Sequence, residues 1–220
     1  MSRNKHPEVT IEKILTISEK LFQTKGYDKT TIHDIIRELE MSKGVIYYHF
    51  TSKEEILDAV IQKQFKASHN NLIEMVNQIE AANAKEKLTK LMEQMASGSK
   101  IHGIQEVMVN QAKNPQFVIS GMQVAVQQEA PFFAEIIKEG IEDGSLHTEF
   151  PEECAETFLL LIDLWCSPLL FHASLEEVKK RLKFLQYNMK TLGVDIVSDQ
   201  LINDIIGFYQ EIHEENELPK

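Results

Sequence analysis

Almost every segment of this 220-residue chain repeats apolar residues at the three- and four-residue spacing of an amphipathic helix. In residues 8–24, for example, Ile14, Leu15 and Phe22 fall on one face. No stretch of useful length alternates apolar and polar residues as a half-buried strand would. Because a helix with one apolar stripe must bury it against other helices, the sequence predicts an all-α fold.

Residues with capping side chains or restricted backbones predict where these helices begin and end. Gly26 ends the first helix, Thr31 and Ser42 cap two short ones, and Ser198 caps the last. Capping boxes stand at 52–55 and 174–177, each ahead of a long apolar repeat. We therefore expect helices over residues 8–24, 32–39, 43–50, from 53, around 88–95, from 115, over 151–171, over 175–192 and over 199–213.

Proline and glycine interrupt the middle of the chain. Pro115 follows Asn114 and is expected at the first position of a helix. Pro131 is expected to kink or break that helix, because it lacks an amide proton and its ring crowds the preceding turn. Gly140 and Gly144 are expected to close the stretch that follows.

The net charge of −11 is distributed unevenly, which matters for nucleic-acid binding. Residues 1–66 hold eleven Lys and Arg against ten Asp and Glu, a balance of +1. Residues 67–220 hold twelve against twenty-four, a balance of −12. Since phosphate contacts are local, a near-neutral N-terminal part can still present a basic face to DNA.

The stretch from Lys25 to Leu57 has the layout of a helix-turn-helix, with two short helices, a tight turn and a long capped helix after them. On a helical wheel, Ile46 and Phe50 share the buried side of the second short helix. Its outward side, residues 43–49, carries small residues, aromatic side chains with polar tips and a cation, but no acid. This composition suits phosphates and base edges.

These residues resemble the DNA-binding domain of the TetR family of repressors. The similarity runs through Gly26-Tyr27, Thr30-Thr31-Ile32 and Ile35, and continues through Ser42-Lys43-Gly44 to Tyr47-Tyr48-His49-Phe50 and Ser52-Lys53-Glu54-Glu55. It covers about fifty residues. The chain departs from the pattern at Glu40, where the family usually has a glycine, so a positive φ there would cost roughly 1 kcal/mol.

The resemblance implies roles for particular residues. Thr31, Ile32 and His33 would approach the DNA backbone or an adjacent base. Base readout would concentrate at the start of the recognition helix, and phosphate contacts at its end and at the start of the long helix. The residues concerned are Ser42, Lys43, Gly44 and Val45 for bases, and Tyr47, Tyr48, His49 and Lys53 for phosphates.

Three of these residues have simpler alternatives. Tyr48 could be a half-buried surface aromatic, and His49 a histidine at the edge of the core. His33 is mostly neutral at pH 7 and need not contact a phosphate. The surrounding motif favours DNA contact.

The resemblance also implies a homodimer formed by the last long helices. The run from Phe158 to Trp165 is apolar around its whole circumference and must be buried on all sides. A central helix of one domain is the alternative. We expect domains at 1–52 for DNA binding and 53–220 for effector binding and dimerisation. The expected interface comprises Phe158, Leu161, Ile162, Leu164, Trp165, Leu182 and Leu185.

Methionine and aromatic side chains of the C-terminal part could line an adaptable pocket for a small-molecule effector, although such residues are more often plain core. The candidates are Met92, Met95, Met108, Phe117, Met122, Phe133, Asp163 and Trp165. Asp163 could meet a cationic ligand, or could pair with a neighbouring helix or lie at the interface. A carboxylate within an apolar run is costly unless it has a partner.

Other classes of protein find little support in the sequence. There is no Glu-x-x-His pair, phosphate-cradling glycine loop or nucleophile elbow, so we expect no catalytic residue, metal or cofactor. The N-terminus lacks a signal-peptide core, and the most apolar run is too short to span a membrane, so a cytoplasmic location with no membrane partner is expected. Cys154 and Cys166 are too far apart on one helix to form a disulfide.

The sequence therefore favours a ligand-responsive repressor that binds palindromic double-stranded operator DNA as a dimer. The alternatives are a helical protein-interaction bundle and an enzyme bundle, neither with sequence-specific DNA binding. The acid-free outward face of residues 43–49 argues against both.

Overall fold

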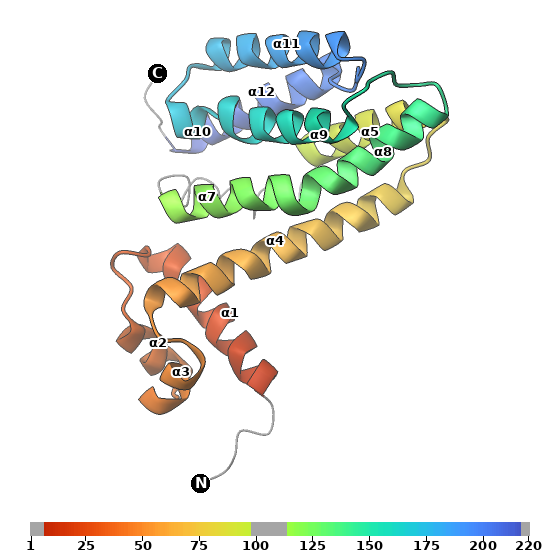
Figure 1. The fold of residues 1–220 in the computed structure, drawn as a ribbon. Coiled ribbons are helices and arrows are strands. Elements are labelled where there is room, and N and C mark those ends of the chain that lie inside the picture. The colour runs from red at the N-terminus through yellow and green to blue at the C-terminus, as the bar shows by residue number, and fades with distance from the viewer. Residues whose placement is uncertain (1–6, 98–113, 217–220) are drawn as a thin grey trace. The chain divides into compact units, whose positions relative to one another are not determined.

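The computed structural model describes residues 7–97 and 114–216, and every regular element within them is a helix (Figure 1). The N-terminal helices are α1 (Pro7–Lys25), α2 (Ile32–Leu39), α3 (Lys43–His49) and α4 (Lys53–Gln78). The later helices are α5 (Ala84–Ser97), α7 (Pro115–Val124), α8 (Ala130–Glu142), α9 (Pro151–Leu160), α10 (Pro168–Phe171), α11 (Leu175–Thr191) and α12 (Asp199–Asn216). The all-α prediction is confirmed.

The chain divides into two compact units, Met1–Ser68 and His69–Lys220. In the N-terminal unit, α1 packs against α2, and Ile14, Ile35 and Ile46 are fully buried. In the C-terminal unit, α8 packs against α9 and α5, and α12 packs against α5 and α11. Apolar side chains from these helices form one continuous core. Each unit thus has an apolar interior of its own.

Several predicted helix boundaries are confirmed by their backbone geometry. Gly26 follows α1 with φ of +85°, a conformation that glycine adopts without strain. Asn114 caps α7 by accepting from the Gln116 amide at 3.1 Å. Ser174 and Glu177 form a complete capping box at the start of α11.

Pro131 does not break its helix, but the regular α-helix is interrupted just before it. The chain runs from α7 through a π-helical segment, η1 (Ala125–Glu129), directly into α8, and Pro131 lies in the first turn of α8. The amide of Ala130 donates to the carbonyl of Ala125, five residues back. This wider turn makes room for the proline ring just after it, so the helix stays continuous.

The helix expected over 151–171 ends earlier than predicted. After α9 the chain widens into a second π-helical segment, η2 (Leu161–Trp165), and the Cys166 amide bonds the Leu161 carbonyl at 2.9 Å. A turn at Ser167 then leads into the separate four-residue α10, which begins at Pro168. Pro168 cannot donate to an earlier carbonyl, which explains the interruption.

Gly140 does not close a helix, contrary to expectation. It lies inside α8, where a Cβ atom would come within 2.7 Å of the Leu146 side chain. Gly144, with φ of +76°, follows the end of α8 as predicted. Gly140 is therefore a packing residue and Gly144 a terminating one.

Candidate DNA-binding surface

Helix α3 has one buried and one open side, as the helical wheel predicts. Ile46 is completely buried and Phe50, just after the helix, is 7% exposed. On the other side Tyr48 is 80% exposed and Tyr47 is 42% exposed. Lys43 is also exposed, and its ammonium lies 5.4 Å from the Tyr47 ring centroid. The outward surface is therefore aromatic and basic.

Three other residues of α3 add detail to this surface. A Cβ atom at Gly44 would meet no atom within 4 Å, and its φ is not positive, so the fold itself does not require glycine there. His49 is only partly exposed, its ring stacks edge-on against Tyr48 at 4.9 Å, and its Nε2 has no hydrogen-bond partner. Val45 is partly buried beside them.

The turn between α2 and α3 depends on Glu40. Its backbone is left-handed, with φ of 51° and ψ of 29°, and its amide bonds the Arg37 carbonyl at 3.3 Å. A non-glycine residue accepts this conformation at a cost of roughly 1 kcal/mol. The turn therefore keeps the geometry for which a glycine would be easier.

Ser42 occupies the N-cap position of α3, yet its side chain makes no capping hydrogen bond. The expectation that it caps the helix is therefore wrong. Ser52 accepts from the Glu55 amide at 3.1 Å, but the Glu55 carboxylate turns to the amide and hydroxyl of Thr51 instead of closing the predicted box. The start of α4 is thus capped through two neighbouring residues.

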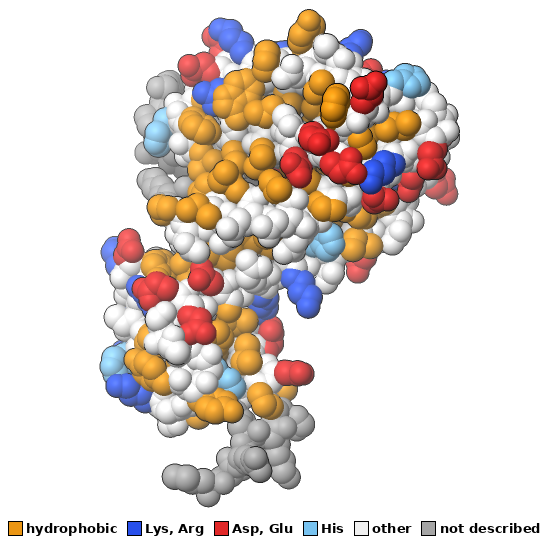
Figure 2. All heavy atoms as spheres, in the orientation of Figure 1, with side chains coloured by type: hydrophobic (Ala, Val, Ile, Leu, Met, Phe, Trp, Pro, Cys, Tyr) orange, Lys and Arg blue, Asp and Glu red, His pale blue; other side chains and the backbone are white. Residues whose placement is uncertain are grey.

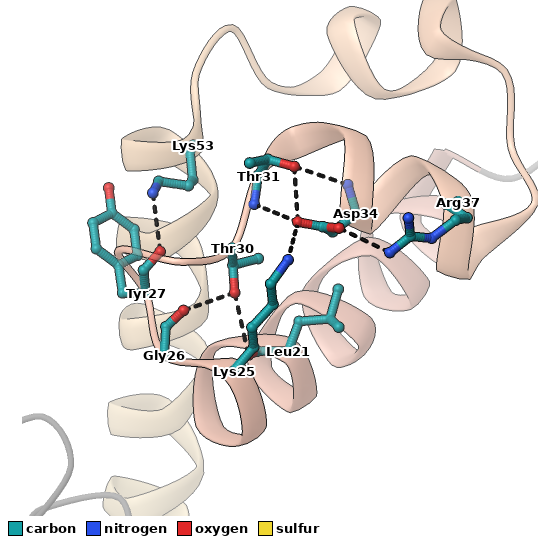
Figure 3. Close-up of polar contacts among 9 residues, drawn as sticks. All are labelled: Leu21, Lys25, Gly26, Tyr27, Thr30, Thr31, Asp34, Arg37 and Lys53. Carbon is teal, nitrogen blue, oxygen red and sulfur yellow. Dashed lines mark hydrogen bonds and ion pairs between the residues drawn. The ribbon is translucent and has the colours of Figure 1, made fainter.

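Asp34 is the centre of a polar network at the start of α2 (Figure 3). Its carboxylate accepts from the Thr31 amide at 2.9 Å, from the Thr31 hydroxyl at 2.8 Å and from the Lys25 ammonium at 2.5 Å. Arg37 pairs with its other oxygen at 2.8 Å. The Lys25 bond, followed by the Thr31 bonds, holds the pKa of Asp34 well below its usual value.

This network assigns the Thr31 donors to the fold. Both its amide and its hydroxyl donate to Asp34, while Ile32 is partly exposed and His33 is exposed beside them. The structure therefore uses both Thr31 donors within α2. The capping role of Asp34, three residues after the Thr31 N-cap, follows from the sequence, whereas the bond from Lys25 was not expected.

Lys53 lies against the turn that follows α1. Its ammonium donates to the Tyr27 carbonyl at 3.0 Å and lies 4.0 Å from the centroid of the Tyr27 ring (Figure 3). The Tyr27 hydroxyl donates to Glu54 at 3.2 Å. Partial burial, reinforced by the charge of Glu54, raises the pKa of Tyr27 to about 12, so the hydroxyl remains protonated.

The residues predicted for an effector pocket have diverse surroundings. Met92 and Phe133 are buried in the core of the C-terminal unit, whereas Met95 and Met122 are each 40% exposed. Phe117 and Trp165 are partly exposed. Met108 lies outside the described residues.

Asp163 has the most unusual environment among these candidates. It keeps accessible surface in the single chain and forms no ion pair or hydrogen bond with a described residue. Crowding by protein atoms, and secondly the charge of Glu129, raises its pKa to about 7. Burial also raises the pKa of Glu129. Asp163 is the middle residue of η2, Glu129 is the last residue of η1, and η1 packs against α9.

Three residues of the predicted dimer interface are buried within the single chain. Phe158, Leu182 and Leu185 are at most 1% exposed, so they have no area left for a second subunit. Leu161, Ile162, Leu164 and Trp165 keep partial exposure. The outer face of α11 instead presents two aromatics not expected from the sequence, Phe184 at 51% and Tyr187 at 68% exposure.

Hydrophobic side chains gather on the face of the C-terminal unit seen in Figure 2, between α7 and α11. Phe184 packs edge-on against Trp165 at 5.8 Å, and Phe171 is 53% exposed. An apolar surface of this kind marks an interaction site more often than plain solvent exposure. The sequence does contain a signal for this surface. Phe184 and Tyr187 lie outside the apolar stripe that α11 forms from Val178, Leu182, Leu185 and Met189.

Within residues 7–97 and 114–216, no group of three or more His, Cys, Asp or Glu could hold a metal ion. Among the same described residues, no helix is long and apolar enough to cross a membrane. Cys154 and Cys166 are both buried and reduced.

Two family models match the chain. Residues 14–60 match "Bacterial regulatory proteins, tetR family", and residues 99–187 match "Tetracyclin repressor-like, C-terminal domain". The first match spans the helix-turn-helix and the start of α4. The second lies entirely within the C-terminal unit.

Two curated relatives are similar over about a third of the chain. An uncharacterised HTH-type transcriptional regulator in the lacX 3' region of Lactococcus lactis subsp. lactis is 42% identical over 82 residues, which are 36% of this chain and 42% of that protein. The biofilm operon icaADBC HTH-type negative transcriptional regulator IcaR of Staphylococcus aureus is 40% identical over 67 residues, which are 30% of this chain and 35% of that protein. The matched region thus spans less than half the length of either relative.

Solved structures share the fold along most of the chain. A TetR-family regulator from Pectobacterium atrosepticum has a TM-score of 0.62 at 17% identity, covering 88% of this chain and 98% of that one. A transcriptional regulator from Saccharomonospora viridis in complex with choline has a TM-score of 0.54 at 21% identity, covering 94% and 96%. RolR in complex with resorcinol has a TM-score of 0.61 at 16% identity, covering 91% and 95%.

Proposed function

This chain belongs to the TetR family of transcription regulators, and we propose that it is a repressor that binds palindromic operator DNA as a homodimer and is released by a small molecule. The outward face of α3 carries the proposal. Tyr47, Tyr48 and Lys43 are exposed there, and Ile46 anchors the opposite side. The face carries no acid to repel phosphates.

In this proposal α3 enters the major groove and α2 supports it. Ser42, Lys43, Gly44 and Val45 face base edges, and the uncapped Ser42 hydroxyl supports this assignment. Phosphate contacts come from the end of α3, the start of α2 and the start of α4. The residues concerned are Tyr47, Tyr48, His49, Ile32, His33 and Lys53. Thr31 positions α2 through Asp34.

Repression is supported by the staphylococcal relative, which is described as a negative transcriptional regulator. The similarity to that protein covers 30% of this chain, so the mode of regulation is a proposal here. A regulator that occupies an operator with α3 blocks transcription by that occupancy alone. No chemical reaction is assigned to the chain.

The homodimer is proposed to form through the outer face of α11 together with the exposed part of η2. Phe184, Tyr187 and Trp165 supply aromatic area, which is the kind that dominates protein interfaces. A two-fold pair of such faces would bring two copies of α3 onto two half-sites, one helical turn or a small multiple apart.

The effector is proposed to bind in the C-terminal region, within the domain of residues 53–220, leaving residues 1–52 to contact DNA. Methionine and aromatic side chains favour a largely apolar molecule. A positively charged group on that molecule would suit Asp163 and Glu129, since a cation would relieve the repulsion between two crowded carboxylates. Release requires the effector to prefer the DNA-free conformation by several kcal/mol.

Selection from a random duplex library at low salt tests DNA binding directly. We expect a palindromic site from the purified wild-type protein, weaker binding to all sequences from Tyr48→Ala, and altered sequence preference from Lys43→Ala. Lys179→Ala, on the surface of α11, is the control and should leave the selected site unchanged. Recovery of no preferred sequence by the wild-type protein would refute the proposal.

A further inference from the structure

We propose that Tyr27 is a positioning residue for DNA binding, whose ring and carbonyl hold the Lys53 ammonium where it meets a phosphate. The inference rests on the proposed function, because it assumes that Lys53 contacts DNA. It assigns to the turn after α1 a task that is separate from packing.

The geometry fixes Lys53 from two directions. Its ammonium donates to the Tyr27 carbonyl at 3.0 Å and faces the Tyr27 ring at 4.0 Å from the centroid. An ammonium has three N–H donors, so the carbonyl leaves two for an oxygen ligand. A long lysine side chain that is already held in place loses less rotamer freedom when it binds a phosphate.

The turn that carries Tyr27 is itself held firmly. Gly26 ends α1 with φ of +85°, and its carbonyl accepts from the buried Thr30 hydroxyl at 2.8 Å (Figure 3). The Tyr27 ring packs edge-on against Phe22 at 5.3 Å, and its hydroxyl donates to Glu54 at 3.2 Å. The clamp is therefore fixed at both the backbone and the ring.

Lys53 differs from other lysines of the N-terminal unit in the groups that its ammonium contacts. Lys25 and Lys63 form ion pairs with Asp34 and Glu12. Lys53, by contrast, forms no ion pair with a carboxylate among the described residues and lies on two neutral groups. A carbonyl and a ring orient the ammonium without cancelling its charge, which remains for a phosphate.

The salt dependence of operator binding tests the inference, since each lost phosphate contact makes the slope of log K against log salt less steep by about 0.9. We expect Lys53→Gln and Tyr27→Leu to reduce the slope by similar amounts. The backbone carbonyl is present in every variant, so Tyr27→Leu removes only the ring; we expect Tyr27→Phe, which retains the ring, to keep the wild-type slope. In the Lys53→Gln background, Tyr27→Leu should change neither slope nor affinity further.

The outcomes separate this inference from the proposed function. If Lys53→Gln leaves the slope unchanged, Lys53 meets no phosphate and both assignments fail for this residue. If Lys53→Gln reduces the slope but Tyr27→Leu does not, or if Tyr27→Leu weakens binding equally in the Lys53→Gln background, Tyr27 is only structural. Should Tyr27→Leu melt below the assay temperature, Tyr27→Met, whose longer and more flexible side chain fills the vacated space more easily, takes its place in the same cycle.

Discussion

Lys25, the last residue of α1, donates to the carboxylate of Asp34 in the first turn of α2 over 2.5 Å. The carboxylate is 11% exposed and also holds both donors of Thr31. One buried acid therefore caps α2 and joins it to α1. Because α2 supports the recognition helix in the proposed function, this junction affects DNA binding without touching DNA.

Replacing Asp34 with Asn should destabilise the N-terminal unit, because the ion pair with Lys25 is lost and the Thr31 donors keep a weaker acceptor. The pKa of Asp34 in the folded protein lies below its ordinary value of 3.8. The ionised carboxylate therefore stabilises the fold fully above about pH 4, and this stabilisation is lost as the pH falls through the folded-state pKa. The difference in melting temperature between wild type and variant should hold down to about pH 5 and narrow below about pH 4.

Glu38→Gln is the matched control for this measurement. Glu38 also pairs with a lysine, Lys20, but at 3.5 Å and with both side chains well exposed. Exposed ion pairs contribute about 0–1 kcal/mol to stability, so this variant should have nearly the melting temperature of the wild type. Equal melting temperatures for Asp34→Asn and wild type at neutral pH would contradict the role given to Asp34.

Thr31 and Ser42 occupy equivalent N-cap positions but should respond differently to alanine. Thr31 accepts from the Asp34 amide at 3.2 Å, so Thr31→Ala should cost about 1 kcal/mol in unfolding free energy. Ser42 makes no capping bond, so Ser42→Ala should cost less than about 0.5 kcal/mol. Urea denaturation followed by circular dichroism measures both; a large loss for Ser42→Ala would mean that its hydroxyl supports the fold.

The helix-turn-helix was predictable because its signals are local. The threonine cap at Thr31 and Gly26 after α1 each follow from a residue and its immediate neighbours, whereas the left-handed conformation of Glu40 was suggested only by the family resemblance. The buried position of Ile46 follows from the period of a single helix. Local sequence signals therefore predicted the helices that form the candidate DNA-binding surface.

The differences arise where tertiary packing decides. In the wide turns at η1 and η2 an amide bonds the carbonyl five residues back instead of four. The spacing of apolar side chains in the sequence does not predict this change. An apolar residue on a helical wheel is equally compatible with the chain's own core and with a partner. Leu182 lies in the core, whereas Phe184, two residues later, is exposed.

Gly193→Ala should be strongly destabilising. Gly193 has φ of +81°, and a Cβ atom there would lie 1.7 Å from the backbone carbonyl oxygen of His147. The His147 amide also donates to the Gly193 carbonyl at 3.0 Å. The loops that carry these two residues therefore cannot move apart without losing that bond. We expect a loss of at least about 2 kcal/mol in unfolding free energy, measured by urea denaturation.

Gly207→Ala is the control for that glycine. It lies inside α12, and a Cβ atom there would meet no atom within 4 Å. Helix propensity should make this variant more stable by up to about 1 kcal/mol. A similar loss at both positions would show that the close approach of His147 is not what makes Gly193 necessary.

Phe184→Glu should produce a monomer that keeps its helical content. Phe184 is 51% exposed in the single chain, so a charge there disturbs a partner and not the core. Light scattering reports the mass, and circular dichroism the helix content. Lys179→Glu makes a larger charge change on another side of α11 and should stay dimeric. If Phe184→Glu is dimeric at micromolar concentration, the two-fold contact lies elsewhere.

Gly44→Ala should separate stability from DNA binding. Gly44 lies in the first turn of α3, where a methyl group would meet no atom within 4 Å and where alanine is the better helix former. The variant should therefore match or exceed wild-type stability, by up to about 1 kcal/mol. Operator affinity should nevertheless fall, because the methyl group would fill the space through which the backbone of α3 approaches the DNA. Thermal melting and operator titration on the same preparation measure the two effects. Unchanged affinity would mean that Gly44 lies away from the groove. The proposed docking would then have to be revised so that another face of α3 meets the DNA.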